Sequence, residues 1–312
     1  MPKSRAGSTT KRSLGGACVT VRNDILLAGL IGRGIARSRT PEMHMAEAFA
    51  QGLRGVYRIV DVDTLPEEDQ NLKAIVHAAE TTGFNGLNVT YPFKMEVIPL
   101  LDELSPNAAA VGSVNTIVFR DGRRIGHNTD LWGFAESFRR NMDGAALDKV
   151  LLIGAGGAGV AVAHALADCG VAHLTIFDLD AARADQLARQ VRDNRPGLTV
   201  GTTAALDETV TQGLTGIVNA SPVGMAKTPG SPFPLGLLRP GIWVADIVYF
   251  PLETELLAGA RKLGCRVLPG SGMAVFQAVR AFELFTGRPA DPLRMKAAFD
   301  AFDQTPRETA DA

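Results

Sequence analysis

The chain has 312 residues, enough for about two domains of ordinary size, and its 46% hydrophobic and 21% charged residues are typical of a globular protein. The formal net charge is −1, which argues against a nucleic-acid partner because phosphate binding requires a surplus of basic residues. Cys18, Cys169 and Cys265 are widely separated, which excludes a disulfide framework and a four-ligand zinc site. We therefore expect no metal, and we interpret Cys169 and Cys265 as buried thiols.

The two ends of the chain differ from the rest in composition. Residues 1–24 contain basic residues but lack the apolar stretch of a secretory signal, so we predict a disordered tail and a cytoplasmic protein. Residues 304–312 are polar and are predicted to form a loose tail. Because no run of about 18 apolar residues occurs, we expect no membrane partner.

Between these tails, the first half of the chain alternates strand and helix patterns. Strands are predicted at 25–32, 57–63, 86–89, 114–119 and 123–126. Asp121 and Gly122 indicate a tight hairpin between the last two strands. One helix is expected to start at Thr40 as N-cap with Pro41 in the first position, and another to cover 67–82.

The second half repeats the alternation more regularly. Strands are predicted at 149–153, 173–177, 198–201, 216–219, 242–247 and 266–268, and helices at 157–169, 181–194 and 254–263. Two further helices, at 272–285 and 292–302, have no strand after them and are expected to pack back on the first domain. The sequence therefore predicts an α/β protein with two domains, the second a Rossmann-type doubly wound domain.

A glycine-rich segment follows the predicted strand 149–153 and opens an alanine-rich helix. It satisfies the pattern G-x-G-x-x-G in the context that the pattern requires, and its residues are Gly154, Ala155, Gly156, Gly157, Ala158 and Gly159. Backbone N–H groups at such a turn can approach a pyrophosphate at the N-terminus of the helix. We interpret this segment as a dinucleotide site.

The next strand ends at Asp178, 19 residues after Gly159. A carboxylate at this place accepts hydrogen bonds from a ribose 2′-hydroxyl and repels a 2′-phosphate. Leu179 and Asp180 follow, where an NADP-binding protein would need an arginine or a group of hydroxyls. The pattern favours NAD as the cofactor.

Polar residues gather where the strands of the first half end. Asn88, Thr90 and Lys94 follow one strand, and Asn115 and Asp130 lie near the ends of the hairpin strands. Oxidation of a hydroxyl needs a group that accepts the proton, and a lysine in a suitable environment can be that group. From the residue pattern alone, a lysine after a Pro-Phe turn is more often a solvated surface residue than a proton acceptor, and Asn115 could simply cap a turn.

Ordered motifs from about residue 26 to 300 resemble the shikimate dehydrogenase family. They are Ser-Arg-Thr-Pro (38–41), GFNGLNVTYPFK (83–94), GSVNT (112–116), GHNTD (126–130), GAGGAG (154–159), NASPVGM (219–225), DIVYFPLETELL (246–257) and GSGMAVFQAV (270–279). The details around residues 38–41 and Asp178 are most similar to the NAD-dependent quinate/shikimate dehydrogenase branch.

The resemblance implies a role for each matching residue. Lys94 and Asp130 would be the catalytic pair, with Lys94 as the proton acceptor. Ser38 and Thr40 would hold the carboxylate of the substrate. Thr90, Asn115 and Gln277 would hold the ring hydroxyls of the substrate, and Tyr249 would lie beside it. The residues at the nicotinamide end of the cofactor would be Ser221, Ile247 and Gly270.

The resemblance also implies domain limits and a reaction. Residues 25–128 and 271–303 would form the substrate-binding domain, and residues 129–270 the NAD-binding domain. The expected reaction is the NAD-dependent oxidation of the C3 ring hydroxyl of quinate or shikimate to the 3-dehydro acid. An amino-substituted ring acid as substrate, or a non-catalytic quinate sensor, are the alternatives. A homodimer is one of the oligomeric states that the sequence leaves open.

Overall fold

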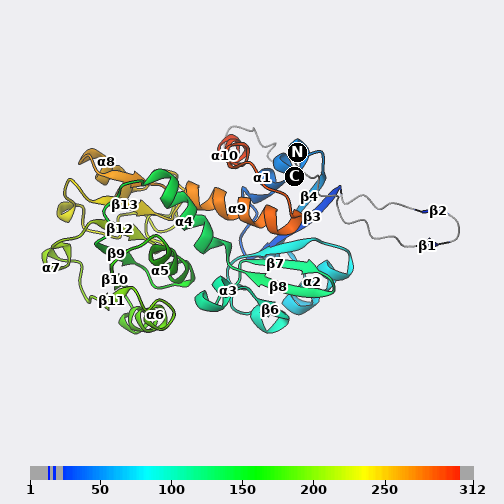
Figure 1. Cartoon of the computed structure of the whole chain (residues 1–312), viewed down its shortest axis with the longest axis horizontal. Helices are drawn as coiled ribbons and strands as arrows, with labels where there is room; N and C mark the ends of the chain where they lie inside the picture. The colour runs from blue at the N-terminus through cyan, green and yellow to red at the C-terminus, as the bar shows by residue number, and fades with distance from the viewer. Residues whose placement is uncertain (1–12, 15–16, 19–23, 303–312) are drawn as a thin grey trace, which may run out of the picture.

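The computed structural model describes residues 13–14, 17–18 and 24–302. The two predicted tails lie almost wholly outside these residues. Within the first of them, the described residues form strands β1 (Ser13–Leu14) and β2 (Ala17–Cys18), which pair antiparallel. The rest of the described chain forms two lobes, each built on its own sheet (Figure 1).

The first lobe contains a six-stranded mixed sheet in the order β4-β3-β5-β7-β8-β6. The strands are β3 (Ile25–Gly32), β4 (Arg54–Asp61), β5 (Gly86–Val89), β6 (Glu103–Leu104), β7 (Thr116–Arg120) and β8 (Arg123–His127). The helices are α1 (Thr40–Ala50), α2 (Leu72–Thr81) and α3 (Pro106–Val111), with 3₁₀ turns η1 (Val62–Thr64), η2 (Glu67–Asp69) and η3 (Ile98–Leu100). Strands β4, β3 and β5 are parallel, so their carboxyl ends and the loops that follow lie at one edge.

The second lobe contains a sheet of six parallel strands in the order β11-β10-β9-β12-β13-β14. The strands are β9 (Lys149–Ile153), β10 (His173–Phe177), β11 (Thr199–Thr202), β12 (Gly216–Asn219), β13 (Trp243–Asp246) and β14 (Arg266–Leu268). The helices are α5 (Gly157–Asp168), α6 (Ala181–Asn194), α7 (Glu208–Thr211) and α8 (Glu255–Lys262), with the 3₁₀ turn η4 (Leu235–Leu237). This is the Rossmann strand order. From β9 the chain first adds β10 and β11 on one side and then β12, β13 and β14 on the other, and ligands bind in such sheets where the two halves meet, between β9 and β12.

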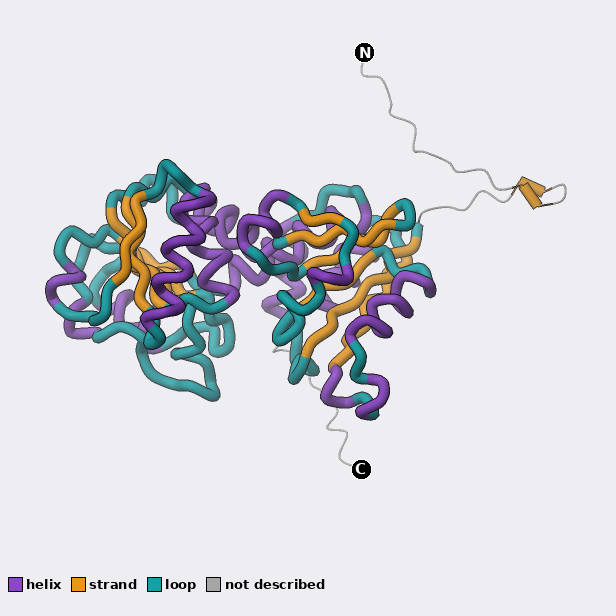
Figure 2. The backbone as a smooth tube through the Cα atoms, turned by 90° about the horizontal axis from the view of Figure 1, so that it is seen from below, coloured by secondary structure: helices purple, strands orange, loops and turns teal. Residues whose placement is uncertain are grey.

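The three remaining helices are α4 (Thr129–Asn141), α9 (Ser271–Thr286) and α10 (Pro292–Ala301). Helices α4 and α9 pack on each other between the two sheets (Figures 1 and 2). Apolar residues of α4 belong to the core of the second lobe, whereas those of α9 and α10 join β3 and α1 in the core of the first. The C-terminal helices therefore return to the first lobe after the second is complete.

The α/β fold class predicted from the sequence is confirmed, and the hairpin at Asp121 and Gly122 forms with both residues at positive φ. Two local predictions are wrong. Thr40 is the first residue of α1 rather than its N-cap, because Arg39 occupies the cap position without a side-chain cap. The helix expected over 67–82 is split, because the Asn71 side chain accepts from the Ala74 N–H and starts α2 anew.

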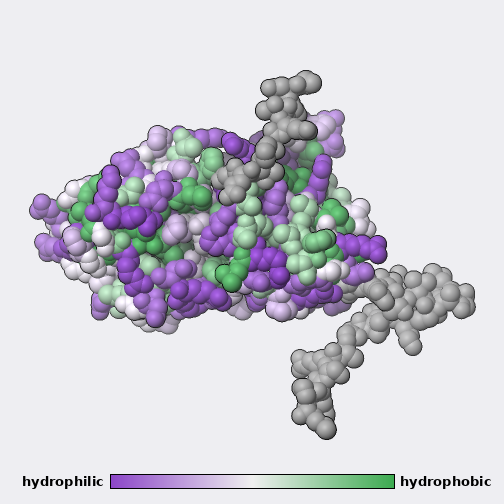
Figure 3. All heavy atoms as spheres, turned by 90° about the horizontal axis from the view of Figure 1, so that it is seen from above, coloured by the Kyte–Doolittle hydropathy of each residue, from purple (hydrophilic) through white to green (hydrophobic). Residues whose placement is uncertain are grey.

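Hydrophilic and hydrophobic residues are interspersed on the face seen in Figure 3. Within the part of the chain that the structure describes, no helix combines the length and the apolar character needed to cross a bilayer.

Candidate active site

Lys94 and Asp130, the two predicted catalytic residues, form an ion pair. Lys94 Nζ donates to Asp130 Oδ2 at 2.6 Å. Lys94 follows β5, where its carbonyl accepts from the Val114 N–H, and Asp130 lies in the first turn of α4 behind the cap residue Asn128. The lysine side chain is 24% exposed and that of Asp130 only 7%. A buried carboxylate at a helix N-terminus thus holds an amine that still reaches the surface and can exchange a proton with a ligand.

Next to this pair, three polar side chains from separate elements form a cluster. Asn115 Oδ1 accepts from the Thr129 N–H at 2.7 Å, and its Nδ2 donates to Thr129 Oγ1 at 3.0 Å and to Gln277 Oε1 at 3.3 Å. Because the Gln277 oxygen faces Asn115, its amide nitrogen is the end that can donate to a ligand. The cluster joins the segment before β7 to α4 and α9, so the tertiary structure alone brings it together.

Ser38 lies in the loop between β3 and α1, and Thr40 is the first residue of α1; both are half-buried. Ser38 Oγ donates to Thr40 Oγ1 at 3.0 Å, so the two hydroxyls lie side by side. Asp61, at the end of β4, fixes the start of the loop by accepting from the Gly34 and Ile35 N–H groups at 3.0 and 2.8 Å. A pair of adjacent hydroxyls on an anchored loop is suited to bind a carboxylate.

Thr90 follows β5, and its N–H donates to the carbonyl of Ile31 at 2.9 Å. Its half-buried side chain packs against Gly32, where a Cβ would lie 2.4 Å from the Thr90 methyl carbon. Thr90 is therefore held at the carboxyl edge of the first sheet, four residues before Lys94.

The glycine-rich segment has the shape that a pyrophosphate requires. Gly154 has φ +103° and Gly159 packs so closely that a Cβ would lie 2.0 Å from the Gly154 carbonyl oxygen. In contrast, a Cβ at Gly156 or Gly157 would meet nothing within 4 Å. The glycines thus close the strand–helix turn on one side and leave the N-terminus of α5 open on the other.

Asp178 lies at the end of β10 beside this segment. Its Oδ2 accepts from the Ala155 N–H at 2.7 Å and its Oδ1 from the Asp180 N–H at 2.9 Å. Each carboxylate oxygen can accept a second hydrogen bond, which leaves capacity for a ribose hydroxyl. Leu179 beside it is 93% exposed, and Asp180 caps α6. These residues fit a dinucleotide without a 2′-phosphate.

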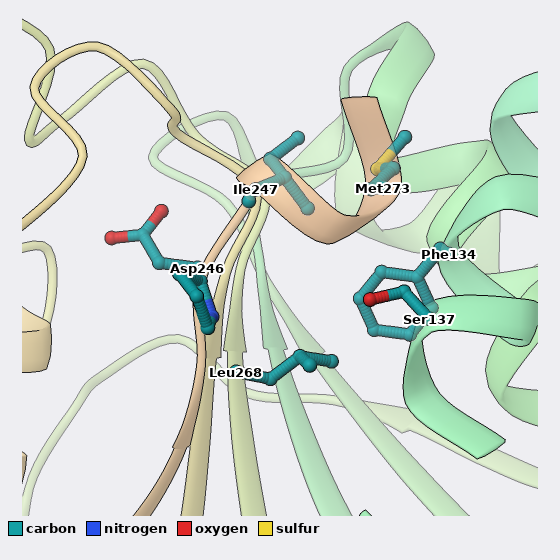
Figure 4. Close-up of a pocket in the computed structure, with 8 residues that line it drawn as sticks. Phe134, Ser137, Asp246, Ile247, Leu268 and Met273 are labelled. Atoms are coloured by element: carbon teal, nitrogen blue, oxygen red, sulfur yellow. The ribbon is translucent and has the colours of Figure 1, made fainter. Parts of the chain in front are cut away.

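Ser221, Ile247 and Gly270, predicted at the nicotinamide end, follow β12, β13 and β14. Ser221 Oγ donates to Asn219 Oδ1 at 2.7 Å. Ile247 and Gly270 line a small hollow between the ends of β13 and β14 and helices α4 and α9 (Figure 4). A Cβ at Gly270 would lie 2.4 Å from the Ile247 carbonyl oxygen, so only glycine allows this approach.

Asp246, at the end of β13, is a buried carboxylate that points away from Phe134 and Ser137 of the hollow (Figure 4). It accepts hydrogen bonds from Asn219 Nδ2, the Val248 N–H and Thr254 Oγ1 at 2.8–2.9 Å. Burial raises its pKa from 3.8 to about 6, although these hydrogen bonds lower it. Asp246 thus fastens together the loops that follow β12 and β13.

Tyr249 brings the two halves of the site together. It follows β13 in the second lobe. Its phenol nevertheless lies within the electrostatic influence of Lys94 and Arg39 in the first lobe and of Asp130 in α4. Desolvation is the largest influence and raises the pKa of Tyr249. The second lobe thus brings Tyr249 close to Lys94, Asp130 and Arg39.

Sequence reasoning missed helix α4, which supports both Thr129 and Asp130. The signal was present, because Asn128 is a good N-cap and apolar residues recur at helical spacing after it, at Leu131, Phe134, Ala135 and Phe138. Thr129 received no role, although it contacts Asn115 through both backbone and side chain.

Cys169, at the end of α5, and Cys265, before β14, lie apart from this site. Burial raises the pKa of Cys169 to about 11 and raises that of Cys265. Both are thiols at neutral pH. Cys265 is buried, as predicted, whereas Cys169 is only half-buried and packs against the core of the second lobe.

Comparison with known families agrees with this geometry. The shikimate dehydrogenase substrate binding domain matches residues 30–117, the shikimate 5′-dehydrogenase C-terminal domain matches residues 270–298, and the ThiF family matches residues 134–194. A shikimate dehydrogenase (NADP(+)) of Streptomyces avermitilis is 53% identical over 281 residues, which cover 88% of this chain and 94% of that protein. The chain belongs to the shikimate dehydrogenase family.

Other members of the shikimate dehydrogenase family are similar over equal lengths. A quinate/shikimate dehydrogenase (NAD(+)) of Corynebacterium efficiens is 47% identical over 281 residues, covering 89% of this chain and 99% of the relative. The structure of quinate dehydrogenase from Corynebacterium glutamicum in complex with NAD matches with a TM-score of 0.85 and 45% identity, covering 89% of this chain and 99% of that one. This dehydrogenase is therefore an oxidoreductase with the family's two-domain fold.

Proposed function

We propose that this protein oxidises the C3 ring hydroxyl of quinate or shikimate to the 3-dehydro acid, reversibly, with NAD as the cofactor. The observation that supports it best is the Lys94–Asp130 pair at 2.6 Å beside the Asn115–Thr129–Gln277 cluster, in a chain of this family. The pair provides proton transfer, and the cluster provides hydrogen bonds that recognise a hydroxylated ring.

In the oxidation direction, Lys94 accepts the proton of the ring hydroxyl through its Nζ. Asp130 orients the amine and stabilises the ammonium that forms, because its buried carboxylate lies in hydrogen-bond contact with Nζ. The substrate carboxylate is held by Ser38 and Thr40. The ring hydroxyls are held by Thr90, Asn115 and Gln277. Tyr249 closes the site from the second lobe. The glycine-rich turn 154–159 and Asp178 would hold NAD, which would supply the acceptor for the hydride that leaves the ring carbon.

The choice of NAD over NADP rests on Asp178. A fixed carboxylate here attracts the 2′-hydroxyl of NAD and repels the additional phosphate of NADP. The named relatives include both kinds, with NADP(+) in the Streptomyces avermitilis protein and NAD(+) in the Corynebacterium efficiens protein. The residues of this chain, rather than overall identity, therefore decide our proposal.

The decisive experiment measures kcat/KM for quinate, shikimate and an amino-substituted analogue, each with NAD and with NADP. We expect turnover of quinate or shikimate with NAD to exceed the other combinations by at least about tenfold, the effect of about 1.4 kcal/mol in the transition state. Preference for the amino analogue would identify another substrate class. Absence of turnover with every acid would revive the interpretation as a non-catalytic sensor.

A further inference from the structure

Arg39 lies between the two predicted carboxylate-binding hydroxyls, Ser38 and Thr40, but its own side chain turns away into the protein. The residue is only 4% exposed. One guanidinium nitrogen donates to the carbonyl of Phe299 in α10 at 3.0 Å. The guanidinium carbon lies 4.6 Å from the centre of the Phe299 ring and 5.2 Å from that of Phe302. The loop is thereby fixed to the C-terminal helix by a hydrogen bond and by stacking on two rings.

The same phenylalanine also contacts the second lobe. Phe299 is 1% exposed, and its ring meets the ring of Tyr249 edge to face at 6.1 Å. The segment before α1 also contacts the loop after β13 directly, because the Arg37 guanidinium lies 5.5 Å from the centre of the Phe250 ring. The loop of Ser38 and Thr40 and the loop of Tyr249 are thus linked through one aromatic ring of α10.

Helix α10 is itself firmly placed on the first lobe. The carboxylate of Glu47 in α1 is buried, and it accepts from the Asp291 N–H at 3.1 Å and from Arg294 Nε at 2.8 Å. Asp291 in turn caps α10 through the N–H groups of Leu293 and Arg294. The helix that holds Arg39 therefore has a fixed position relative to the substrate loop.

We propose that Arg39 and Phe299 are a positioning pair. Through them, α10 fixes the position of Ser38 and Thr40, whose hydroxyls bind the substrate carboxylate, relative to Tyr249. Binding of the carboxylate and the approach of the second lobe are therefore coupled. This inference rests on the proposed function for the identity of the substrate. Neither residue touches the reacting atoms.

Arginine at this place differs from lysine for a physical reason. A planar guanidinium stacks on two rings and still donates in its plane to a carbonyl, whereas an ammonium is a strongly hydrated point charge that cannot stack. Arg39→Lys keeps the charge and loses the geometry. Phe299→Leu keeps apolar volume and removes the ring that both Arg39 and Tyr249 contact.

The test compares Arg39→Lys and Phe299→Leu with Phe285→Leu, a matched change of a buried phenylalanine in the same core that contacts neither Arg39 nor Tyr249 in the described contacts. Steady-state kinetics are measured with the acid and with NAD varied separately. We expect both positioning variants to raise KM for the acid roughly tenfold, as loss of a desolvated cation–π contact predicts, with KM for NAD changed less than about twofold. Phe285→Leu should lower the melting temperature without raising KM for the acid.

Hydrogen exchange of the amides in residues 34–43 and 247–250 gives a measurement that does not depend on turnover. Faster exchange in both segments, in the two positioning variants and not in Phe285→Leu, supports the pair even if the wild-type protein oxidises neither acid, in which case only the proposed function fails. Unchanged KM and unchanged exchange in an active enzyme would overturn the inference. So would a KM effect that Phe285→Leu reproduces, since it would then follow from lost stability alone.

Discussion

The surroundings of Lys94 in the structure distinguish it from an ordinary surface lysine. In the sequence it is one lysine after a Pro-Phe turn, and in the structure it is bound to a buried carboxylate beside an amide cluster. Its role as the proton acceptor is a prediction that substitution can test.

We expect Lys94→Ala to lower kcat by about 10²–10⁴-fold, the usual contribution of a general acid or base. The measurement is the rate of NAD reduction with saturating quinate or shikimate. Lys296→Ala is the control, because Lys296 pairs with Asp300 on the exposed side of α10. Near-normal turnover in Lys94→Ala would show that another group accepts the proton.

Asp246 predicts a dependence of stability on pH. Its pKa is raised from 3.8 to about 6 in the folded protein, so between about pH 4 and pH 6 the folded state retains a proton that the unfolded chain has released. Stability from this group therefore falls as pH rises through that window, by about 3 kcal/mol in total, and the cost is fully present above pH 6.

Asp246→Asn removes this titration and keeps the shape. Relative to the wild type, the variant should gain unfolding free energy steadily from pH 4 to pH 6, as measured by urea unfolding at several pH values. Asp193→Asn, on the exposed face of α6, serves as the comparison. A constant difference between Asp246→Asn and the wild type across this range would contradict the raised pKa.

At the scale of elements, the contact between α4 and α9 places residues of both helices in the site. Gly133 allows this contact, since a Cβ there would lie 2.7 Å from the Gln277 backbone nitrogen and 2.9 Å from the Met273 carbonyl oxygen. Because both neighbours are backbone atoms, they cannot rotate away, and the helices must separate. The separation would also move Gln277 away from Asn115.

We therefore expect Gly133→Ala to cost about 1–3 kcal/mol of unfolding free energy and to raise KM for the acid. Gly201→Ala in β11 is the matched control, because a Cβ at Gly201 meets nothing within 4 Å. Denaturant unfolding and substrate kinetics on both variants check the prediction. Equal stability of the two variants would show that the helices adapt to the added methyl group without cost.

At the scale of the whole molecule, we expect the cofactor to act through the second lobe, which holds the glycine-rich turn. A ligand that binds only the folded state stabilises it by about 2.7 kcal/mol at a concentration of 100 times Kd. We expect NAD to raise the melting temperature more than NADP at equal concentration. Asp178→Ala should abolish that difference, whereas Asp193→Ala should preserve it, because Asp193 is exposed on α6 and remote from the glycine-rich turn. A larger shift with NADP in the wild type would reverse the assignment.

Much of this protein follows from local sequence patterns. The parallel strands and the glycine-rich turn were predictable because apolar runs and glycines act over a few residues, and Asp178 because a fixed spacing along the chain places it next to Ala155. Helix α4 was missed although its cap and spacing were present, because it begins at the predicted domain break.

What the sequence determined by itself is the α/β class, the dinucleotide turn and the residue types available for proton transfer. The tertiary structure alone decided that Asn115 contacts Gln277, 162 residues later in the sequence, and that Arg39 contacts Phe299, 260 residues later. Such contacts depend on how helices pack between two sheets, and packing is set by the shape of whole surfaces rather than by the order of neighbours along the chain.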